Sequence, residues 1–439
     1  MRFRSSAVLT ALAVVAGSVS LFGVAAAPAV ADSSTQLPVS SFGDIVVDGV
    51  LDRVFISDPE GGSIVVTDYD GTVVKHITAE DGATGLALSA DSSELYVALS
   101  SAGAIATVST STLAETGRYP TGAGTSPRNL ALAGGKLWFG YAVDSRGGIG
   151  SLDLSVEAPV ATLDPAGAPW YYAPSLAPSP ADPNILVAGQ EGVSPATLAV
   201  YEVTPTGLQE QAKRLFTQNP GISFLNDFAV TADGQNIVTA ANNPAEHQII
   251  RISDLSANGA YSSWAFPNAV AVSADGTVAT ASSDSTLSTF RAGSFSRLRE
   301  YYRAEPQRDG LAWAPDDNRL FAVGGDVIPS LHVFPDGGKT DSTLNLQAPS
   351  TAVRGKELTV TGSLWADEPY TAAATVEVTR TDSESPSGAD LGRFTVAADG
   401  SFRFKDRPRT TGQVTYTVRY AGDTQHTAAV GEAEVTVVK

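Results

Sequence analysis

Five short groups of polar and aromatic residues recur along the chain, each just before or at the start of a strand-like apolar run. They combine arginines, side-chain amides and carboxylates with the aromatic triplet Trp170-Tyr-Tyr172. Aromatic faces cover the apolar hydrogens of a sugar ring or peptide, while amides and acids bond its polar groups. If the runs converge in space, these residues form a ligand-binding site. The candidate ligand-binding residues are Arg128, Trp170, Tyr172, Asn226, Asp227, Asn268, Arg308 and Asp309.

A structural interpretation of the same residues stays open. Trp170 and Tyr172 would then pack beneath the Pro-rich segment 166–182, because a Pro-rich insertion has to form a surface loop. Asp227 would cap a turn, as short acidic side chains often do. The two interpretations differ in whether the aromatic rings face a ligand or the protein interior.

The sequence lacks the motifs of catalytic and metal-binding sites. It has four histidines and no cysteine, and no histidine belongs to an HExxH motif or an HxH pair that would indicate zinc. The nucleophile motif GxSxG and the phosphate-binding motif GxxxxGK[ST] are also missing. We therefore expect no catalytic residue, no metal and no cofactor. His247, expected in the loop after the second strand of its repeat, is the one histidine kept as a candidate.

The element that must position the candidate residues is a repeated hairpin, clearest at residues 86–100. Alternating apolar residues lead into a polar turn and a second apolar run, which predicts two strands. Copies of this hairpin begin near 45, 86, 130, 174, 228, 270 and 311. A period of roughly 40 to 55 residues with strands in every unit is typical of propeller blades. A second pair of strand-like runs follows each hairpin, so the sequence predicts seven four-stranded blades.

Closure of the ring needs one strand from elsewhere, because the last repeat supplies only three. The segment Gln36–Ser40 precedes the first repeat and is the available candidate. Pairing it with the last blade would remove two exposed strand edges at once.

The last hundred residues have a different spacing of strand-like runs. From Thr343 onward about seven strands alternate cleanly, which is the size and spacing of an immunoglobulin-like sandwich. Trp365 and Tyr416 are expected in its core, and the turn-forming segment 335–339 is the expected hinge.

Two parts of the chain resemble known families. The Ser-Ala-Asp turns at 89–91 and 273–275 and the Ala-Pro-Asp turn at 314–316 resemble those of secreted YVTN-repeat and lactonase-like propellers, relatives of the WD-repeat class. Tyr96-Val97 keeps only half of the motif that names the group. The stretch 416–423 resembles the final strands of bacterial Ig-like repeats. The resemblances imply an all-β protein with a seven-bladed β-propeller and an Ig-like domain, which is usually a spacer or an adhesive module.

Residues 1–31 have the pattern of a secretory signal peptide. Arg2 and Arg4 precede a long apolar run, and Ala29-Val-Ala31 fits the small-residue cleavage rule. An uncleaved membrane anchor is the alternative. The sequence therefore predicts a signal peptide at 1–31, a propeller at 32–340 and an Ig-like domain at 341–439.

The net charge of the chain indicates which classes of partner it can bind. The net charge of −19 disfavours binding to nucleic acid or anionic lipid, which depends on Lys and Arg displacing counterions. Arg297, Arg299, Arg303 and Arg308 form a basic cluster along the sequence. Charges on an outer strand would protect the rim from edge-to-edge pairing, and a docking patch is the alternative.

These observations predict a secreted, extracellular, non-catalytic recognition protein. Its propeller face would bind a glycan or an extracellular protein, as a lectin-like or docking subunit of a secreted assembly. No nucleic acid and no membrane insertion after signal cleavage are expected, and the sequence sets no oligomeric state. The alternative is a hydrolase or lactonase-like enzyme that uses the central funnel.

Overall fold

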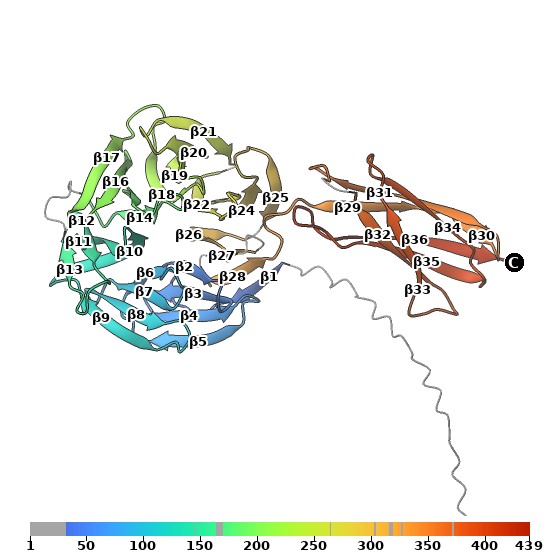
Figure 1. The fold of residues 1–439 in the computed structure, drawn as a ribbon, viewed down its shortest axis with the longest axis horizontal. Helices are drawn as coiled ribbons and strands as arrows, with labels where there is room; N and C mark the ends of the chain where they lie inside the picture. The colour runs from blue at the N-terminus through green and yellow to red at the C-terminus, as the bar shows by residue number, and fades with distance from the viewer. Residues whose placement is uncertain are drawn as a thin grey trace, which may run out of the picture.

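The computed structural model describes residues 32–144, 146–163, 170–263, 265–302, 304–315, 319–325, 328–370 and 373–439. The expected signal peptide at 1–31 and Arg303 lie outside the described residues. The described residues form an all-β fold in which seven four-stranded antiparallel sheets make a ring and a second group of strands projects from its side (Figure 1). No helix in the described part of the chain is long and apolar enough to cross a membrane.

The first four sheets of the ring each use four consecutive strands. They are β2 (Ile45–Asp48), β3 (Arg53–Asp58), β4 (Ser63–Asp68) and β5 (Val73–Thr78); β6 (Ala83–Leu88), β7 (Glu94–Leu99), β8 (Ala104–Ser109) and β9 (Glu115–Pro120); β10 (Thr125–Ala133), β11 (Lys136–Val143), β12 (Arg146–Leu152) and β13 (Ala161–Leu163); and β14 (Ser175–Pro178), β15 (Ile185–Gly189), β16 (Thr197–Thr204) and β17 (Gly207–Leu215).

The remaining sheets complete the ring. They are β18 (Ser223–Val230), β19 (Asn236–Asn243), β20 (Glu246–Arg251) and β21 (Ala257–Ser262); β22 (Pro267–Val272), β23 (Val278–Ser282), β24 (Thr286–Phe290) and β25 (Arg297–Tyr302); and β26 (Pro306–Trp313), β27 (Leu320–Gly324) and β28 (Ser330–Phe334) with β1 (Ser33–Gln36). The first strands β2, β6, β10, β14, β18, β22 and β26 contact one another in sequence, and β26 contacts β2. This closed circuit confirms the predicted seven-bladed propeller with the first strand of each repeat innermost.

Burial changes from the middle to the outside of each blade. In the first blade, β3 and β4 are continuous apolar runs such as Val54-Phe-Ile56, all fully buried. Both faces of these strands are covered by neighbouring blades, so they do not alternate between apolar and polar residues. The outer strand β5 is mostly exposed and carries Lys75 and His76. The core of the propeller therefore lies between the blades.

The ring is closed by the N-terminal segment, as predicted, but by different residues. β1 pairs antiparallel with β28, from Ser33 opposite Val333 to Gln36 opposite Ser330. The backbone N–H of Leu37 donates to Pro329 O at 2.9 Å, and the ladder ends there. The expected segment Gln36–Ser40 was wrong by about three residues; Pro38 has no N–H to extend the ladder.

The C-terminal strands form two sheets that pack face to face. One contains β29 (Ser342–Gln347), β31 (Leu358–Ala366) and β34 (Ser401–Asp406); the other contains β30 (Thr351–Val353), β36 (Ala429–Val438), β35 (Gly412–Tyr420), β32 (Thr375–Thr381) and β33 (Ala389–Thr395). Val360, Val376 and Tyr416 are fully buried between them, which gives the predicted sandwich. Trp365 is 58% exposed, so its predicted burial was wrong. Its neighbours Leu364 and Ala366 face the core, and alternation along β31 turns Trp365 outward.

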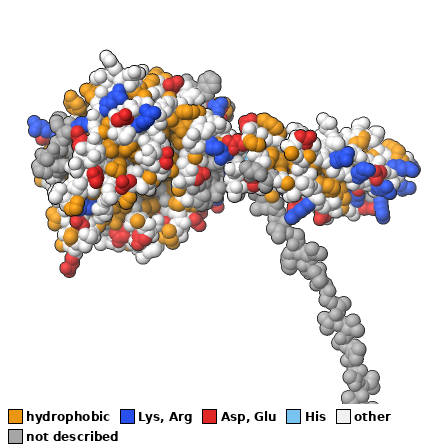
Figure 2. All heavy atoms as spheres, turned by 45° about the horizontal axis from the view of Figure 1, so that its top comes forward, with side chains coloured by type: hydrophobic (Ala, Val, Ile, Leu, Met, Phe, Trp, Pro, Cys, Tyr) orange, Lys and Arg blue, Asp and Glu red, His pale blue; other side chains and the backbone are white. Residues whose placement is uncertain are grey.

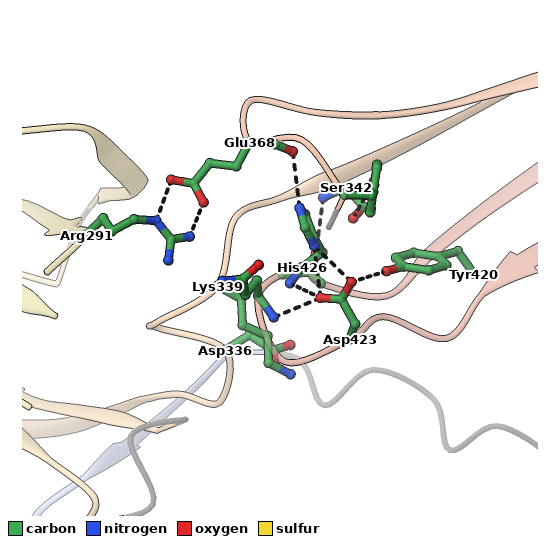
Figure 3. Close-up of polar contacts among 11 residues, drawn as sticks. Arg291, Asp336, Lys339, Ser342, Glu368, Tyr420, Asp423 and His426 are labelled. Carbon is green, nitrogen blue, oxygen red and sulfur yellow. Dashed lines mark hydrogen bonds and ion pairs between the residues drawn. The ribbon is translucent and has the colours of Figure 1, made fainter. Parts of the chain in front are cut away.

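Ion pairs join the sandwich to the propeller (Figure 3). Arg291, which follows β24, forms a bidentate ion pair with Glu368 of the sandwich, in which Nε lies 2.5 Å from Oε1. Arg299 on β25 contacts Asp341 at 3.1 Å. Arg297 and Arg299 share β25, as the sequence predicts, but Arg299 reaches the start of the sandwich instead of solvent.

A buried histidine organises the sandwich side of this junction. The His426 ring lies against Asp423, with Nδ1 2.9 Å from Oδ1, and its Nε2 is 3.1 Å from the backbone oxygen of Glu368 (Figure 3). Thr340, just before β29, bonds back to Gln425 through a backbone N–H···O contact of 2.9 Å. The connecting segment is thus tied into the sandwich at its end, and Glu368 is presented to Arg291 from a fixed loop.

Candidate functional site

The inner strands all begin on one face of the ring, which we call the mouth. A cavity of about 630 Å3 opens there, and its polar lining comes from the first four blades together with β26. The aromatic, basic, amide and acidic side chains in this lining are Phe42, Tyr172, Arg128, Asn129, Asp144, Glu191 and Asp309. A second cavity of about 180 Å3 continues along the inner strands and is bordered by Asp44, Asn129, Ser175, Asp227 and Asp309. The repeated hairpin therefore does bring residues from distant repeats to one site.

Two carboxyl groups in these cavities have pKa values near neutrality. Burial raises the pKa of Asp44 to about 7, although its carboxylate accepts backbone N–H bonds from Leu86 and Ile45. Burial also raises the pKa of Glu191 to about 7. A hydrogen bond from the Ser175 hydroxyl and the nearby charges of Arg308 and Arg128 oppose that rise, while Asp227 adds to it. Both groups can exchange a proton at neutral pH.

Asp227 and Asp309, two further carboxyl groups of these cavities, share a hydrogen bond. Asp309 donates to Asp227, and burial raises the pKa of both groups. The pKa of Asp309 is raised further by the negative charges of Glu191, Asp227 and Asp44. Asp309 also has a positive φ of 54°, a strained conformation for a residue with a side chain. When the pair carries one proton, Asp309 therefore holds it and Asp227 accepts the hydrogen bond.

Several of the predicted site residues connect neighbouring blades. Asp227 accepts the backbone N–H of Val270 at 2.7 Å, Asn226 donates to Pro267 O at 2.7 Å, and Asn268 donates to Pro306 O at 3.3 Å. Asp44 repeats the pattern with Leu86 at 2.8 Å. Each bond leaves the start of one inner strand and ends on the next blade, so these side chains fasten the ring. Asn226 is fully buried, whereas Asp227 also borders the inner cavity.

The two aromatic residues predicted at the site, Trp170 and Tyr172, lie in different environments. Trp170 is 4% exposed, packs with blade residues such as Tyr201, and has the Lys213 ammonium 4.9 Å above its ring. This placement agrees with the structural interpretation of Trp170. Tyr172 is 59% exposed and borders the mouth cavity, so its ring is open to a ligand. Arg128 and Arg308 are both exposed, and each lies close enough to Glu191 to lower the pKa of that carboxyl.

Sequence reasoning missed Asp44, Ser175 and Asn129. Asp44 lies directly before the first repeat, as Asp227 lies directly before the fifth. Aligning the repeats would therefore have identified Asp44 as a site residue equivalent to Asp227. Glu191 was expected only as part of a polar rim, and no sequence pattern indicates its contact with Ser175, because the two meet across the hairpin of β14 and β15.

His247 is not available for chemistry at the mouth. It lies on β20 rather than in a loop, is fully buried, and has its Nε2 3.3 Å from Ala269 O. Burial lowers its pKa to about 4. The described residues contain no group of three or more His, Cys, Asp or Glu side chains placed to hold a metal ion.

Comparison with known proteins supports the architecture. No protein-family model and no curated sequence match the chain. Among solved structures, it is similar to hydrazine synthase of Kuenenia stuttgartiensis, with a TM-score of 0.53 and 13% identity over 68% of this chain and 97% of that one. It is also similar to the Cps50 (Swd1) β-propeller domain of Myceliophteria thermophila, with a TM-score of 0.53 and 14% identity over 70% of this chain and 99% of that one. At such low identity these similarities establish the fold alone: the ring is a β-propeller.

Proposed function

We propose that this chain is a secreted, extracellular recognition protein whose propeller binds a glycan or a protein partner at its mouth. The observation that carries the proposal is the mouth cavity, in which the exposed ring of Tyr172 lies with Arg128, Asn129 and Glu191. An open aromatic face beside donors and acceptors suits a ligand that has both apolar and hydroxyl or amide surfaces. The sandwich acts in this proposal as an Ig-like spacer or adhesive module, as in a docking subunit.

The two aromatic residues supply a matched test. Tyr172→Ala should weaken binding of a ligand selected from a glycan and secreted-protein array by about 1–3 kcal/mol, the scale of a lost aromatic contact. The melting temperature of the Tyr172→Ala variant should stay near that of the unmodified protein, because the exposed ring packs against few core residues. Trp170→Ala should do the reverse: it should cost about 3–5 kcal/mol of stability and leave the affinity per folded molecule unchanged.

Melting curves and binding isotherms measured on both variants decide the matter. Undiminished affinity in Tyr172→Ala would remove the mouth aromatic from the proposal. A loss of affinity only in Trp170→Ala would place the ligand elsewhere on blade 4.

One observation favours a second function, acyl transfer in the funnel. The Ser175 hydroxyl donates to Glu191, whose pKa of about 7 suits a general base at neutral pH, and Asn129 donates to the same hydroxyl oxygen at 3.1 Å. In such a reaction the Ser175 oxygen would bond to a carbonyl carbon while its proton passed to Glu191. The Arg128 guanidinium would stabilise the negative oxygen that develops. This arrangement corresponds to a hydrolase or lactonase-like activity.

A fluorophosphonate probe tests this alternative directly. If Ser175 is a nucleophile, the probe should attach to Ser175 with loss of fluoride, found by peptide mass spectrometry. Ser175→Ala should abolish the attachment, and Glu191→Gln should slow it by roughly 100-fold or more, the scale of a lost general base. A folded protein that stays unlabelled at pH 8 would exclude the alternative and leave Ser175 as a link between strands.

A further inference from the structure

The end of the sandwich farthest from the propeller gathers basic side chains. Figure 2 shows blue side chains concentrated on this end of the molecule. They come from two loops some fifty residues apart in sequence, 354–356 and 407–409, and from the adjoining strand β34. We call Arg354, Lys356, Lys405, Arg407 and Arg409 the distal basic cluster; all five are exposed.

Backbone contacts hold the two loops together. The N–H of Gly355 donates to Pro408 O at 2.8 Å, and the N–H of Arg354 donates to Val438 O at 2.8 Å. In the strand ladder, Thr359 on β31 lies opposite Lys405 on β34. The cluster is therefore a fixed feature of the fold, although the sequence alone shows only half of it.

The cluster is under-neutralised. Glu357 contacts Lys405 at 2.7 Å and Arg407 at 3.1 Å, so one carboxylate serves two cations. Arg354, Lys356 and Arg409 form no ion pair within the described residues. The five cations of the cluster thus share one paired carboxylate, Glu357, in a chain whose net charge is −19. The acidic mouth lies on another part of the molecule, beyond the distance of about 10 Å over which salt screens exposed charges.

Protection of an edge strand explains only part of this arrangement. β34 is an edge of its sheet, and charged residues such as Lys405 discourage edge-to-edge pairing. Arg354 continues the edge strand β30 through its N–H bond to Val438 O, so the same role covers this residue. Lys356 and Arg409 lie in loops outside the strands, so that role does not account for them.

We propose that the distal basic cluster is a docking surface for an acidic polysaccharide, a glycan with carboxylate or sulfate groups along its chain. Three of the five cations are arginines, whose planar guanidinium matches such anions with two parallel hydrogen bonds. The residues border none of the cavities described here, so the surface suits an extended polymer better than a small anion. The exposed apolar side chains beside it, Val353 and Val438, offer no aromatic group for a membrane interface. This surface is separate from the mouth, and the proposal does not depend on the function assigned there.

The test uses the full-length protein and heparin as the acidic polysaccharide. Binding should be measurable at about 0.1 M salt and should weaken steeply as salt rises, because cations on the protein displace counterions from the polymer. Arg354→Gln, Arg407→Gln and Arg409→Gln combined should weaken binding about tenfold or more. The matched control removes three exposed arginines from other surfaces, as Arg297→Gln, Arg393→Gln and Arg419→Gln. It changes the net charge equally and should weaken binding less than about threefold, since distant charges are screened.

Each other outcome overturns the proposal. Absence of heparin binding, or equal losses in the two triple variants, would show that the cluster is not the docking surface. Tighter binding to duplex DNA, or to vesicles containing phosphatidylserine, would assign the cluster to a nucleic acid or a membrane instead. Tyr172→Ala should leave heparin binding unchanged, so failure at the mouth and failure at this surface give different results.

Discussion

A chain that begins at Pro38 should melt about 10 °C or more below one that begins at Asp32, because the truncation opens the ring. The lost segment supplies the β1 ladder to β28 and the side chain of Leu37, which is 2% exposed. Removing a buried leucine costs about 2–5 kcal/mol, and each backbone hydrogen bond adds about 1 kcal/mol. A loss of that size lowers the melting temperature of a large domain by about 2–4 °C per kcal/mol. Calorimetry on the two chains measures the difference.

The control keeps the backbone of β1 and removes its exposed side chains. Ser33→Ala, Ser34→Ala and Gln36→Ala together should shift the melting temperature by less than about 2 °C, because surface substitutions have small effects. Equal melting of the truncated and complete chains would mean that β1 contributes nothing to closure. In that case the last blade would be stable with three strands.

Stability should fall as the pH rises from about 4 to about 7, because the funnel carboxyl groups resist ionisation in the folded state. A group whose pKa is raised on folding adds stability while both states are protonated, and that stability is lost as the unfolded chain ionises first. For Asp44, a pKa that moves from 3.8 to about 7 corresponds to about 4 kcal/mol. For Glu191, a move from 4.5 to about 7 corresponds to about 3 kcal/mol. His247 opposes this decline, because its pKa falls from 6.5 to about 4 on folding and the unfolded chain therefore holds that proton longer, which corresponds to about 3 kcal/mol. The net loss of stability should therefore be about 4 kcal/mol.

Urea unfolding at a series of pH values measures this decline. Glu191→Gln should flatten part of it, because glutamine carries no proton to release and can still bond to Ser175. Glu60→Gln is the matched control on the same face, since Glu60 is exposed, and it should leave the slope unchanged. A stability that is constant between about pH 4 and about pH 7 would contradict the prediction.

The fold was predictable because its signals are local and repeated. Each hairpin is recognisable from its alternating apolar and polar residues and its polar turn. Seven copies in one chain leave few arrangements that bury all of their apolar faces. The sequence predicted which segment closes the ring but not its bounds, since the four residues of β1 are all polar and have no apolar pattern to fix them. Trp365 was misplaced because an aromatic residue in a strand was assigned to the core without counting its position in the alternation.

The site was less predictable because it depends on contacts between repeats. Asn226 and Asn268 look like ligand-binding amides, yet their side chains bond to the next blade, and only the closed ring reveals that. The link between Ser175 and Glu191 and the distal basic cluster both join segments whose separation in sequence carries no periodic signal. Residue type indicates what a side chain can bond to, whereas the partner is set by the tertiary fold.

Closure by β1 also sets the order of events while the chain is being made. Its partner β28 is synthesised about 300 residues later, so the first strand to emerge is among the last to pair. Until then β1 and the open edge of the first blade are exposed to other chains. Contacts between residues so far apart in sequence form slowly, because a large loop must be closed first. The nascent protein therefore passes through a long-lived open ring, a form on which chaperones or a neighbouring copy could act before the native circle exists.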